Sequence, residues 1–256
     1  MKKLLASDYD GTLLLQGEIF SRDLEAISNF RNNGNLFGII TGRSISMIVD
    51  DLENHQIPLD FLVCNNGGII CDYQLNIVRR HDIPIELAIE LIQSIRAKWK
   101  VMLGISDGDA FGSVTSIIIP ASKTFIPPKN MKKIPYEEIL ANKKVNSIII
   151  RGKTHVETLG IKDHLEQVYG NQISLHFNNG TLDINSNIVS KKNAVYELGE
   201  YFQTSKLHVI GDGYNDLEMI REFKGFALEN AVDIVKTHAG SVVPSVSVGI
   251  NMIEME

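Results

Sequence analysis

The segment Lys3-Leu4-Leu5-Ala6-Ser7-Asp8-Tyr9-Asp10-Gly11-Thr12 is the most informative part of the sequence, because a short apolar run ends in an acidic turn that contains glycine. A continuous apolar run of this length predicts a strand buried on both faces, as in a parallel sheet. The same succession recurs three times: residues 36–40 precede Thr41-Gly42-Arg43, residues 61–64 precede Asn65-Asn66-Gly67-Gly68, and residues 207–210 precede Gly211-Asp212-Gly213-Tyr214-Asn215-Asp216.

Segments of helical periodicity separate these runs, at about residues 21–33, 45–52, 191–202 and 216–222. Strands that alternate with helices predict an α/β fold, with a doubly wound, mostly parallel and Rossmann-like sheet that helices cover on both faces. Ligands bind such sheets outside the carboxyl ends of the strands. The four polar turns are therefore expected to meet at one edge of the sheet.

The middle of the chain follows a different pattern. A helix is predicted at 85–99, followed by a hairpin of two strands at 101–105 and 113–119. Beyond an exposed loop rich in proline and lysine at 127–135, further strands are predicted at 145–151, 173–177 and 181–184, with a helix at 155–169. We therefore expect a core made of residues 1–80 and 183–256, and an inserted α+β cap domain made of residues 81–182.

Composition argues against several classes of protein. The formal net charge is −6 and no basic tract is present, so a nucleic-acid partner is not expected. No apolar run reaches membrane-spanning length, and Asp8 interrupts the first run too early for a signal peptide. Cys64 and Cys71 form no CxxC pair, so neither a zinc site nor a disulfide framework is expected. We expect a cytoplasmic protein without a membrane partner, and the sequence leaves its oligomeric state open.

The residue types in the four turns suit phosphoryl transfer through a carboxylate. Asp8 can attack phosphorus and form an aspartyl-phosphate, which divides one slow hydrolysis into two faster steps. Because two anions repel each other, a hard divalent cation such as Mg²⁺ is needed, and Asp8 and Asp212 supply carboxylates for it. Asp10 is the candidate acid and base. Lys191 and Thr41 are the candidates for holding the remaining phosphate oxygens.

Four motifs in order resemble those of the haloacid dehalogenase (HAD) superfamily, and specifically its Cof-type phosphatases with the larger α/β cap (type II, subclass B). The first stretch, Asp8-Tyr9-Asp10-Gly11-Thr12-Leu13, is similar to DxDGTL, and Thr41-Gly42-Arg43 is similar to the second motif. The others are Ser190-Lys191-Lys192-Asn193-Ala194, similar to SKGxAL, and Gly211-Asp212-Gly213-Tyr214-Asn215-Asp216 with Met219, similar to GDGxNDxxM. Asn66-Gly67-Gly68 also resembles a turn of this subfamily. Lys192, Val195 and Glu229 depart from the usual residues, but none of them removes a chemical group.

The resemblance implies a role for each matching position. Asp8 is implied as the nucleophile and a metal ligand, Asp10 as the acid and base whose backbone carbonyl also binds Mg²⁺, and Asp212 as the third protein ligand. Asn215 and Asp216 are implied to orient the surroundings of the metal. Thr41 and Lys191 are implied to hold phosphoryl oxygens. The positions implied to lie against the substrate are Gly42, Arg43, Asn66 and Asn215.

We therefore predict a Mg²⁺-dependent phosphatase that hydrolyses a small phosphorylated metabolite, such as a sugar phosphate, under a cap that excludes water. A phosphosugar mutase is an alternative, because the aspartyl-phosphate can pass to another hydroxyl instead of water. A non-catalytic binding module on the same fold is a third reading, which the two carboxylates of the first turn, Asp8 and Asp10, disfavour. Asp107, Arg151 and Asn178 are candidates to line the cap.

Overall fold

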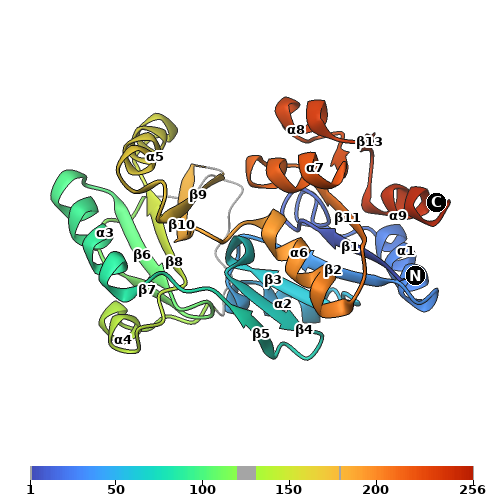
Figure 1. Ribbon diagram of the computed structural model, residues 1–256, viewed down its shortest axis with the longest axis horizontal. Coiled ribbons are helices and arrows are strands. Elements are labelled where there is room, and N and C mark those ends of the chain that lie inside the picture. The colour runs from blue at the N-terminus through green and yellow to red at the C-terminus, as the bar shows by residue number, and fades with distance from the viewer. Residues whose placement is uncertain (1, 120–130, 179, 256) are drawn as a thin grey trace.

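The computed structural model describes residues 2–119, 131–178 and 180–255, which form two sheets (Figure 1). Within these residues, the larger sheet has eight strands in the order β13-β12-β11-β1-β2-β3-β4-β5. The smaller sheet has five strands in the order β7-β6-β8-β10-β9. Both chain termini lie on the larger sheet's side of the molecule. The predicted fold class, a wound α/β core with an inserted α+β segment, is confirmed.

The centre of the larger sheet is parallel, and β1 lies in the middle of it. On one side Ala6 is opposite Gly38, and on the other side it is opposite Val209. Leu4, Leu5 and Ala6 have no exposed surface, which explains the continuous apolar run in the sequence. The parallel strands are β1 (Lys3–Ser7), β2 (Leu36–Ile40), β3 (Phe61–Cys64), β11 (Lys206–Gly211), β12 (Phe226–Leu228) and β13 (Ser241–Val243).

Helices cover both faces of this sheet, and two neighbouring residues of β1 show the division. Leu5 belongs to the apolar core shared with α1 (Ser21–Asn32), α2 (Ile45–Asn54) and α9 (Val246–Met255). Leu4 belongs to the core shared with α6 (Lys191–Phe202), α7 (Leu217–Phe223) and α8 (Asp233–His238). Because successive strand residues point to opposite faces, this alternation confirms the double winding.

Two strands at one edge of the larger sheet were not predicted. After β3 the chain forms the 3-10 turn η1 (Asn65–Gly67), and then β4 (Ile69–Asp72) and β5 (Ile77–Arg80) run antiparallel. The turn between them is closed by the Asp72 carboxylate, which accepts hydrogen bonds from the backbone N–H groups of Gln74 and Asn76. Each strand has only four residues, and β5 is partly exposed, so its apolar pattern is weak.

The smaller sheet is antiparallel, and among the described residues its helices pack on one face. Its apolar core includes Leu103, Ile150 and Leu182 from the strands, together with residues of α3 and α5. Arg151 and Asp183 alternate with these buried residues and therefore point to the opposite face, where Asp183 meets Asn66 of the core. The elements are α3 (Ile85–Lys98), β6 (Met102–Ser106), β7 (Phe111–Ser113), α4 (Tyr136–Ala141), β8 (Ser147–Arg151), α5 (His155–Tyr169), β9 (Ile173–Asn178) and β10 (Thr181–Ser186).

The expected elements of this segment differ from the observed ones in two places. The strand predicted at 113–119 lies earlier, at Phe111–Ser113, and residues 114–119 form no strand. Within the loop predicted at 127–135, residues 127–130 lie outside the described residues. We propose that the core resumes after Ser186 and not at 183, because a boundary at 182 would divide β10. Among the described residues, no helix is both long enough and apolar enough to cross a membrane.

Candidate active site

The parallel pairing of β1 with β11 brings two distant carboxylates to one edge of the sheet. Ser7 is opposite Ile210, so Asp8 and Asp212 both follow the carboxyl ends of neighbouring strands. The turn η2 (Tyr214–Asp216) then returns a third carboxylate to the same place. Ligand oxygens of Asp8, Asp212 and Asp216 lie within 4.8 Å of one another. The prediction that the first and fourth polar turns converge therefore agrees with the geometry.

Lys191 supplies a buried cation to this acidic cluster. It is the first residue of α6, and the helix starts here because the Ser190 side chain accepts a hydrogen bond from the backbone N–H of Asn193. The Lys191 Nζ atom lies 2.5 Å from Asp8 Oδ1 and 2.6 Å from Asp216 Oδ1. Its side chain has no exposed surface. A buried ammonium of this kind is tolerated only because it has carboxylate partners.

Acidic groups outnumber cationic ones in the cluster. Burial raises the pKa of Asp8 well above its usual range, and the neighbouring Asp216 carboxylate raises it further, while Lys191 opposes the shift. Burial also raises the pKa of Asp212, to about 6. For Lys191, burial alone would lower the pKa, but the carboxylates of Asp216 and Asp8 outweigh it and raise the pKa. Three carboxylates share one ammonium, so a divalent cation would relieve the remaining repulsion.

The donor set fits Mg²⁺, which prefers carboxylate oxygens and water. Asp216 has both of its oxygens engaged: Oδ1 accepts from Lys191, and Oδ2 accepts from the backbone N–H groups of Asp212 and Gly213. Asp216 is therefore suited to shape the turn that presents Asp212. The remaining carboxylates, Asp8 and Asp212, are the residues that would hold the ion directly. The motifs imply the same division for these three side chains, and it stays a prediction, as does the role of the Asp10 carbonyl.

Gly11 and Thr12 of the first turn both lie against the Asp212 carboxylate. The Thr12 hydroxyl donates to Asp212 Oδ1 at 2.6 Å. Gly11 has a left-handed φ of +93°, and a Cβ at this position would lie 2.4 Å from Asp212 Oδ2. The first turn therefore requires glycine for two reasons, its backbone conformation and the close approach of the carboxylate. Neither residue was singled out as part of the site from the sequence.

Asp10 is not part of the cluster of Asp8, Asp212 and Asp216, and forms an ion pair with Arg43. The guanidinium donates from Nε and Nη2 to the two oxygens of Asp10, at 2.8 and 2.6 Å. It also donates to Asp51 Oδ2 at 2.8 Å and lies over the ring of Tyr9. The Asp10 side chain is 40% exposed. The structure therefore brings together Asp10 and Arg43, which the sequence had assigned to different tasks, and it places Asp51 beside them.

Thr41 and Gly42 follow β2, the strand next to β1. Thr41 is buried, its N–H donates to the Val63 carbonyl, and its Oγ1 accepts from the N–H of Arg43. A Cβ on Gly42 would lie 3.2 Å from Asn66 Oδ1. The turns after β2 and β3 are therefore in close contact, as expected for polar turns at one sheet edge.

Asn66 connects the core to the cap. It has a left-handed φ of 58°, and its amide donates to Asp183 Oδ2 of β10 at 3.0 Å. Its Oδ1 accepts from Asn215 Nδ2 at 3.1 Å. The resulting chain of side chains runs from the cap sheet through the third turn to the fourth turn. Asp216, one residue further on, binds Lys191.

Asp183 was missed as a site residue. Burial raises its pKa to about 7, and the Asn66 hydrogen bond and the charge of Arg151 oppose the shift. A signal was present in the sequence, because Leu182 and Ile184 are buried in the cap and the residue between them must face the other way. The expected boundary between residues 182 and 183 divides this strand between the two domains, so the pattern does not indicate a side chain of the cap.

The three cap residues proposed from the sequence occupy different positions. Arg151 lies on the same face of the cap sheet as Asp183 and donates to the Thr181 hydroxyl. Asn178 lies near the fourth turn, since its Oδ1 would be 3.8 Å from a Cβ on Gly213. Asp107 instead closes its own loop by accepting hydrogen bonds from the N–H groups of Asp109 and Ala110.

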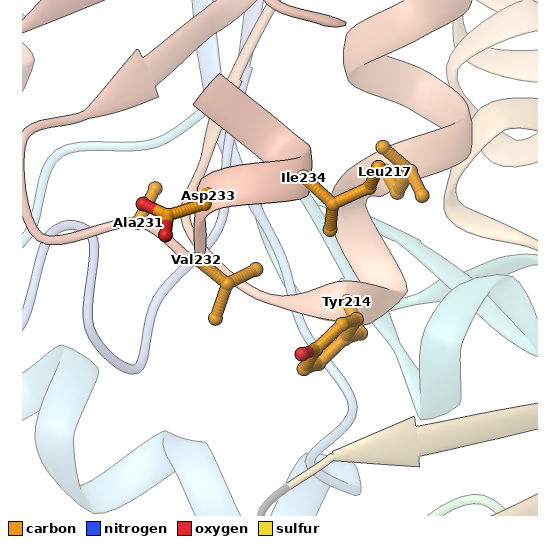
Figure 2. A pocket seen from close by; sticks show the side chains of 6 residues that line it. All are labelled: Tyr214, Leu217, Ala231, Val232, Asp233 and Ile234. Carbon is orange, nitrogen blue, oxygen red and sulfur yellow. The ribbon is translucent and has the colours of Figure 1, made fainter. Parts of the chain in front are cut away.

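A surface pocket lies beside the fourth turn, and Figure 2 shows its lining side chains. Val232, which contributes to the lining, donates its N–H to the Asp212 carbonyl, so the pocket lies next to the turn that carries Asp212. The lining is mostly apolar and contains one carboxylate and no cation: Tyr214, Leu217, Ala231, Val232, Asp233 and Ile234. A lining without a cation does not suit a phosphate group, in contrast to the cluster around Lys191.

Acidic side chains at the carboxyl edge of a wound sheet, with a second domain inserted above them, are the arrangement of a capped α/β enzyme. The chain belongs to the haloacid dehalogenase-like hydrolases, whose family model matches residues 5–250. The resemblance stated from the four motifs, including its Cof-type assignment, is therefore confirmed.

Several relatives match along nearly their whole length. An HMP-PP phosphatase of Yersinia pestis is 26% identical over 248 residues, which cover 92% of this chain and 87% of the relative. Among solved structures, a HAD/COF-like hydrolase from Plasmodium vivax has a TM-score of 0.82 at 23% identity, with 100% of this chain and 96% of that chain covered. A HAD subclass IIB sugar phosphatase has a TM-score of 0.77 at 20% identity, with 99% and 98% covered. These two structures show the fold.

Proposed function

We propose that this protein is a Mg²⁺-dependent phosphatase that hydrolyses a small phosphorylated metabolite, such as a sugar phosphate, through an aspartyl-phosphate on Asp8. The observation that carries the proposal is the position of Lys191 Nζ, 2.5 Å from Asp8 and 2.6 Å from Asp216, beside the carboxylate of Asp212. A site that only binds a cation has no need of a buried ammonium against its ligands, whereas a phosphoryl group needs both charges.

The ion would be held by Asp8 and Asp212, and it would neutralise charge between the phosphoryl group and the attacking carboxylate. An oxygen of Asp8 forms the bond to phosphorus as the bond from phosphorus to the ester oxygen breaks. Lys191 and Thr41 hold the non-bridging oxygens while charge develops on them. Asp216 keeps Lys191 and the fourth turn in place through its three hydrogen bonds.

Asp10 has two successive tasks in this proposal. As an acid it gives its proton to the departing ester oxygen, and as a base it then takes a proton from the water that attacks the aspartyl-phosphate. In the structure its carboxylate is paired with Arg43. The side chain therefore has to turn from Arg43 toward the substrate, and its 40% exposure leaves room for that rotation.

The substrate class is supported by the cap and by the relatives. The cap presents Asp183 and Arg151, one carboxylate and one guanidinium, toward the side on which Asn66 lies. Polar groups of both signs suit a leaving group that carries hydroxyls or other hydrogen-bonding groups. The HMP-PP phosphatase of Yersinia pestis and the subclass IIB sugar phosphatase are both named for small phosphorylated substrates.

A screen of phosphorylated metabolites tests the proposal. Released phosphate is measured with Mg²⁺ and again with EDTA, for the wild-type chain and for Asp8→Asn, which keeps the shape of the side chain but removes the nucleophilic oxygen. We expect turnover of at least one substrate by the wild-type chain, and none with EDTA or in the variant. Unchanged turnover in Asp8→Asn would end the nucleophile assignment. Formation of a sugar-phosphate isomer without free phosphate would indicate the mutase instead.

A further inference from the structure

Three buried asparagines meet where the cap joins the core. Asn65 lies in the turn after β3, Asn146 directly precedes β8 of the cap, and Asn185 lies in β10, the last strand of the cap. Their exposed fractions are 4%, 0% and 0%. Burying an amide side chain is unfavourable unless its hydrogen bonds are made inside the protein. Each of the three amides therefore needs hydrogen-bond partners inside the protein.

Asn146 bonds to the core turn and to the first connection between the domains. Its Oδ1 accepts from Asn65 Nδ2 at 2.9 Å. Its Nδ2 donates to the Gly68 carbonyl at 3.0 Å, to the His81 carbonyl at 3.0 Å and to Asp82 Oδ1 at 3.2 Å. The two hydrogens of one amide are thus shared among three acceptors. One cap side chain consequently holds both ends of the turn Asn65–Gly68 and the chain segment that leads into the cap.

Asn185 ties the second connection to the same point. Its Nδ2 donates to the backbone carbonyl of Asn146 at 2.9 Å and to that of Asn65 at 3.4 Å. Its own Oδ1 is buried without a partner among the described residues. The segment that enters the cap and the strand that leaves it are therefore both anchored at Asn146. A rotation of the cap relative to the core would therefore change the hydrogen bonds of Asn146.

The turn that Asn146 holds is conformationally demanding. Asn65, Asn66 and Gly67 are consecutive and all have left-handed φ values, of 49°, 58° and 110°. Such conformations are costly for residues with a side chain and persist only when surrounding contacts impose them. The packing is also close, because a Cβ on Gly68 would lie 2.5 Å from Asn146 Oδ1. The turn carries Asn66, the residue that contacts Asp183 of the cap and Asn215 of the fourth turn.

We propose that Asn146 is a positioning residue that couples the orientation of the cap to the catalytic turn, acting through Asn66. This inference rests on the proposed phosphatase function, because Asn66 matters only if a substrate is bound between core and cap. Asn146 touches neither the metal ligands nor Lys191, so its effect has to pass through the turn. A purely structural role for the same amide would instead lower the stability of the cap without changing catalysis.

A matched pair of variants separates these roles. Asn146→Ala removes the coupling group. Thr158→Val is the control, because Thr158 is equally buried and its hydroxyl bonds to Gly152, Thr154 and Gly180, all within the cap. On the best substrate of the screen, we expect Asn146→Ala to lower kcat by about tenfold to a hundredfold, since small misplacements in an active site have effects of this size. The Mg²⁺ concentration at half-maximal activity should stay unchanged.

Hydrogen exchange gives a readout that does not depend on turnover. In Asn146→Ala, the amides of residues 65–68 and 81–83 should exchange at least about tenfold faster, while those of β1 and of α5 keep wild-type rates. If Asn146→Ala does not fold, Asn185→Ala provides the second variant, with the same direction and a smaller effect. Equal kcat and equal exchange in the Asn146 or Asn185 variant and in Thr158→Val would overturn the inference. A wild-type chain that hydrolyses no phosphate ester would overturn the proposed function, and the exchange data would still decide the coupling.

Discussion

The ammonium of Lys191 lies 2.5 Å from Oδ1 of Asp8, although 183 positions separate the two residues in the chain. The contact exists because α6 begins at the carboxyl edge of the sheet, where β1 ends. It places one buried positive charge between Asp8 and Asp216. Replacing Lys191 tests both the stability and the chemistry of the site.

Lys191→Met should abolish turnover and destabilise the metal-free protein by about 3–5 kcal/mol, because two buried carboxylates lose their partner. Denaturant unfolding in EDTA measures the loss. Lys192→Met is the matched control, since Lys192 is the next residue of α6, is partly exposed and lies 3.8 Å from Glu218. We expect a change below about 1 kcal/mol there. Equal losses in the two variants would contradict the role given to Lys191.

Gly11→Ala should weaken Mg²⁺ binding by displacing Asp212, whose Oδ2 would lie 2.4 Å from the new Cβ. The Mg²⁺ dependence of activity and calorimetric titration both measure this effect. Gly17→Ala controls for backbone strain, because Gly17 has a similar φ of +87° and no atom within 4 Å of a Cβ. The control should lose stability but keep its affinity for Mg²⁺. Wild-type affinity in Gly11→Ala would show that the close approach has no functional consequence.

Stability of the metal-free protein should fall as the pH rises from about 4 to about 7. Burial raises the pKa of Asp212 to about 6 and that of Asp183 to about 7, so the folded state binds protons that the unfolded state has already released. Each such carboxyl contributes a slope of at most about 1.4 kcal/mol per pH unit, and Asp8 acts in the same direction. Thermal or denaturant unfolding in EDTA across this range measures the slope.

Asp183→Asn should flatten that slope, because the amide cannot titrate. Asp163→Asn, an exposed position on α5 of the same cap, should leave it unchanged. Mg²⁺ should stabilise the protein more at pH 7 than at pH 5, since it binds the ionised form of Asp8 and Asp212. A stability that rises with pH in EDTA would contradict the pKa directions on which this prediction rests.

Asp10→Asn should slow the hydrolysis of an alkyl phosphate far more than that of p-nitrophenyl phosphate. The alkoxide is a poor leaving group and needs a proton, whereas p-nitrophenolate leaves without one. Comparing kcat/KM for the two substrates in wild type and variant measures the difference. Asp51→Asn removes the other carboxylate on Arg43 and should preserve the wild-type ratio between the substrates. An equal loss for both substrates in Asp10→Asn would remove its assignment as the acid.

Much of the catalytic edge could be predicted because its residues follow strands that periodicity reveals. Asp8 and Thr41 come directly after an apolar run, Asp212 follows one after a single glycine, and parallel strands end at one edge of the sheet. The role of Asp183 could not be predicted with the same ease. It lies 117 positions from Asn66 in the sequence, and the contact depends on how the cap is oriented on the core.

The sequence alone was enough to predict the wound sheet, the inserted cap and the turns that carry Asp8 and Asp212. The reason is that the spacing of apolar residues along the chain distinguishes strands from helices. Only the tertiary structure determined the hydrogen-bond and ion-pair partners of the site residues. Asp10 pairs with Arg43, Asp216 uses both its oxygens, and Asn146 joins the two domains. The reason is that hydrogen bonds form or fail over a few tenths of an ångström, and such distances result from the packing of helices and domains against each other.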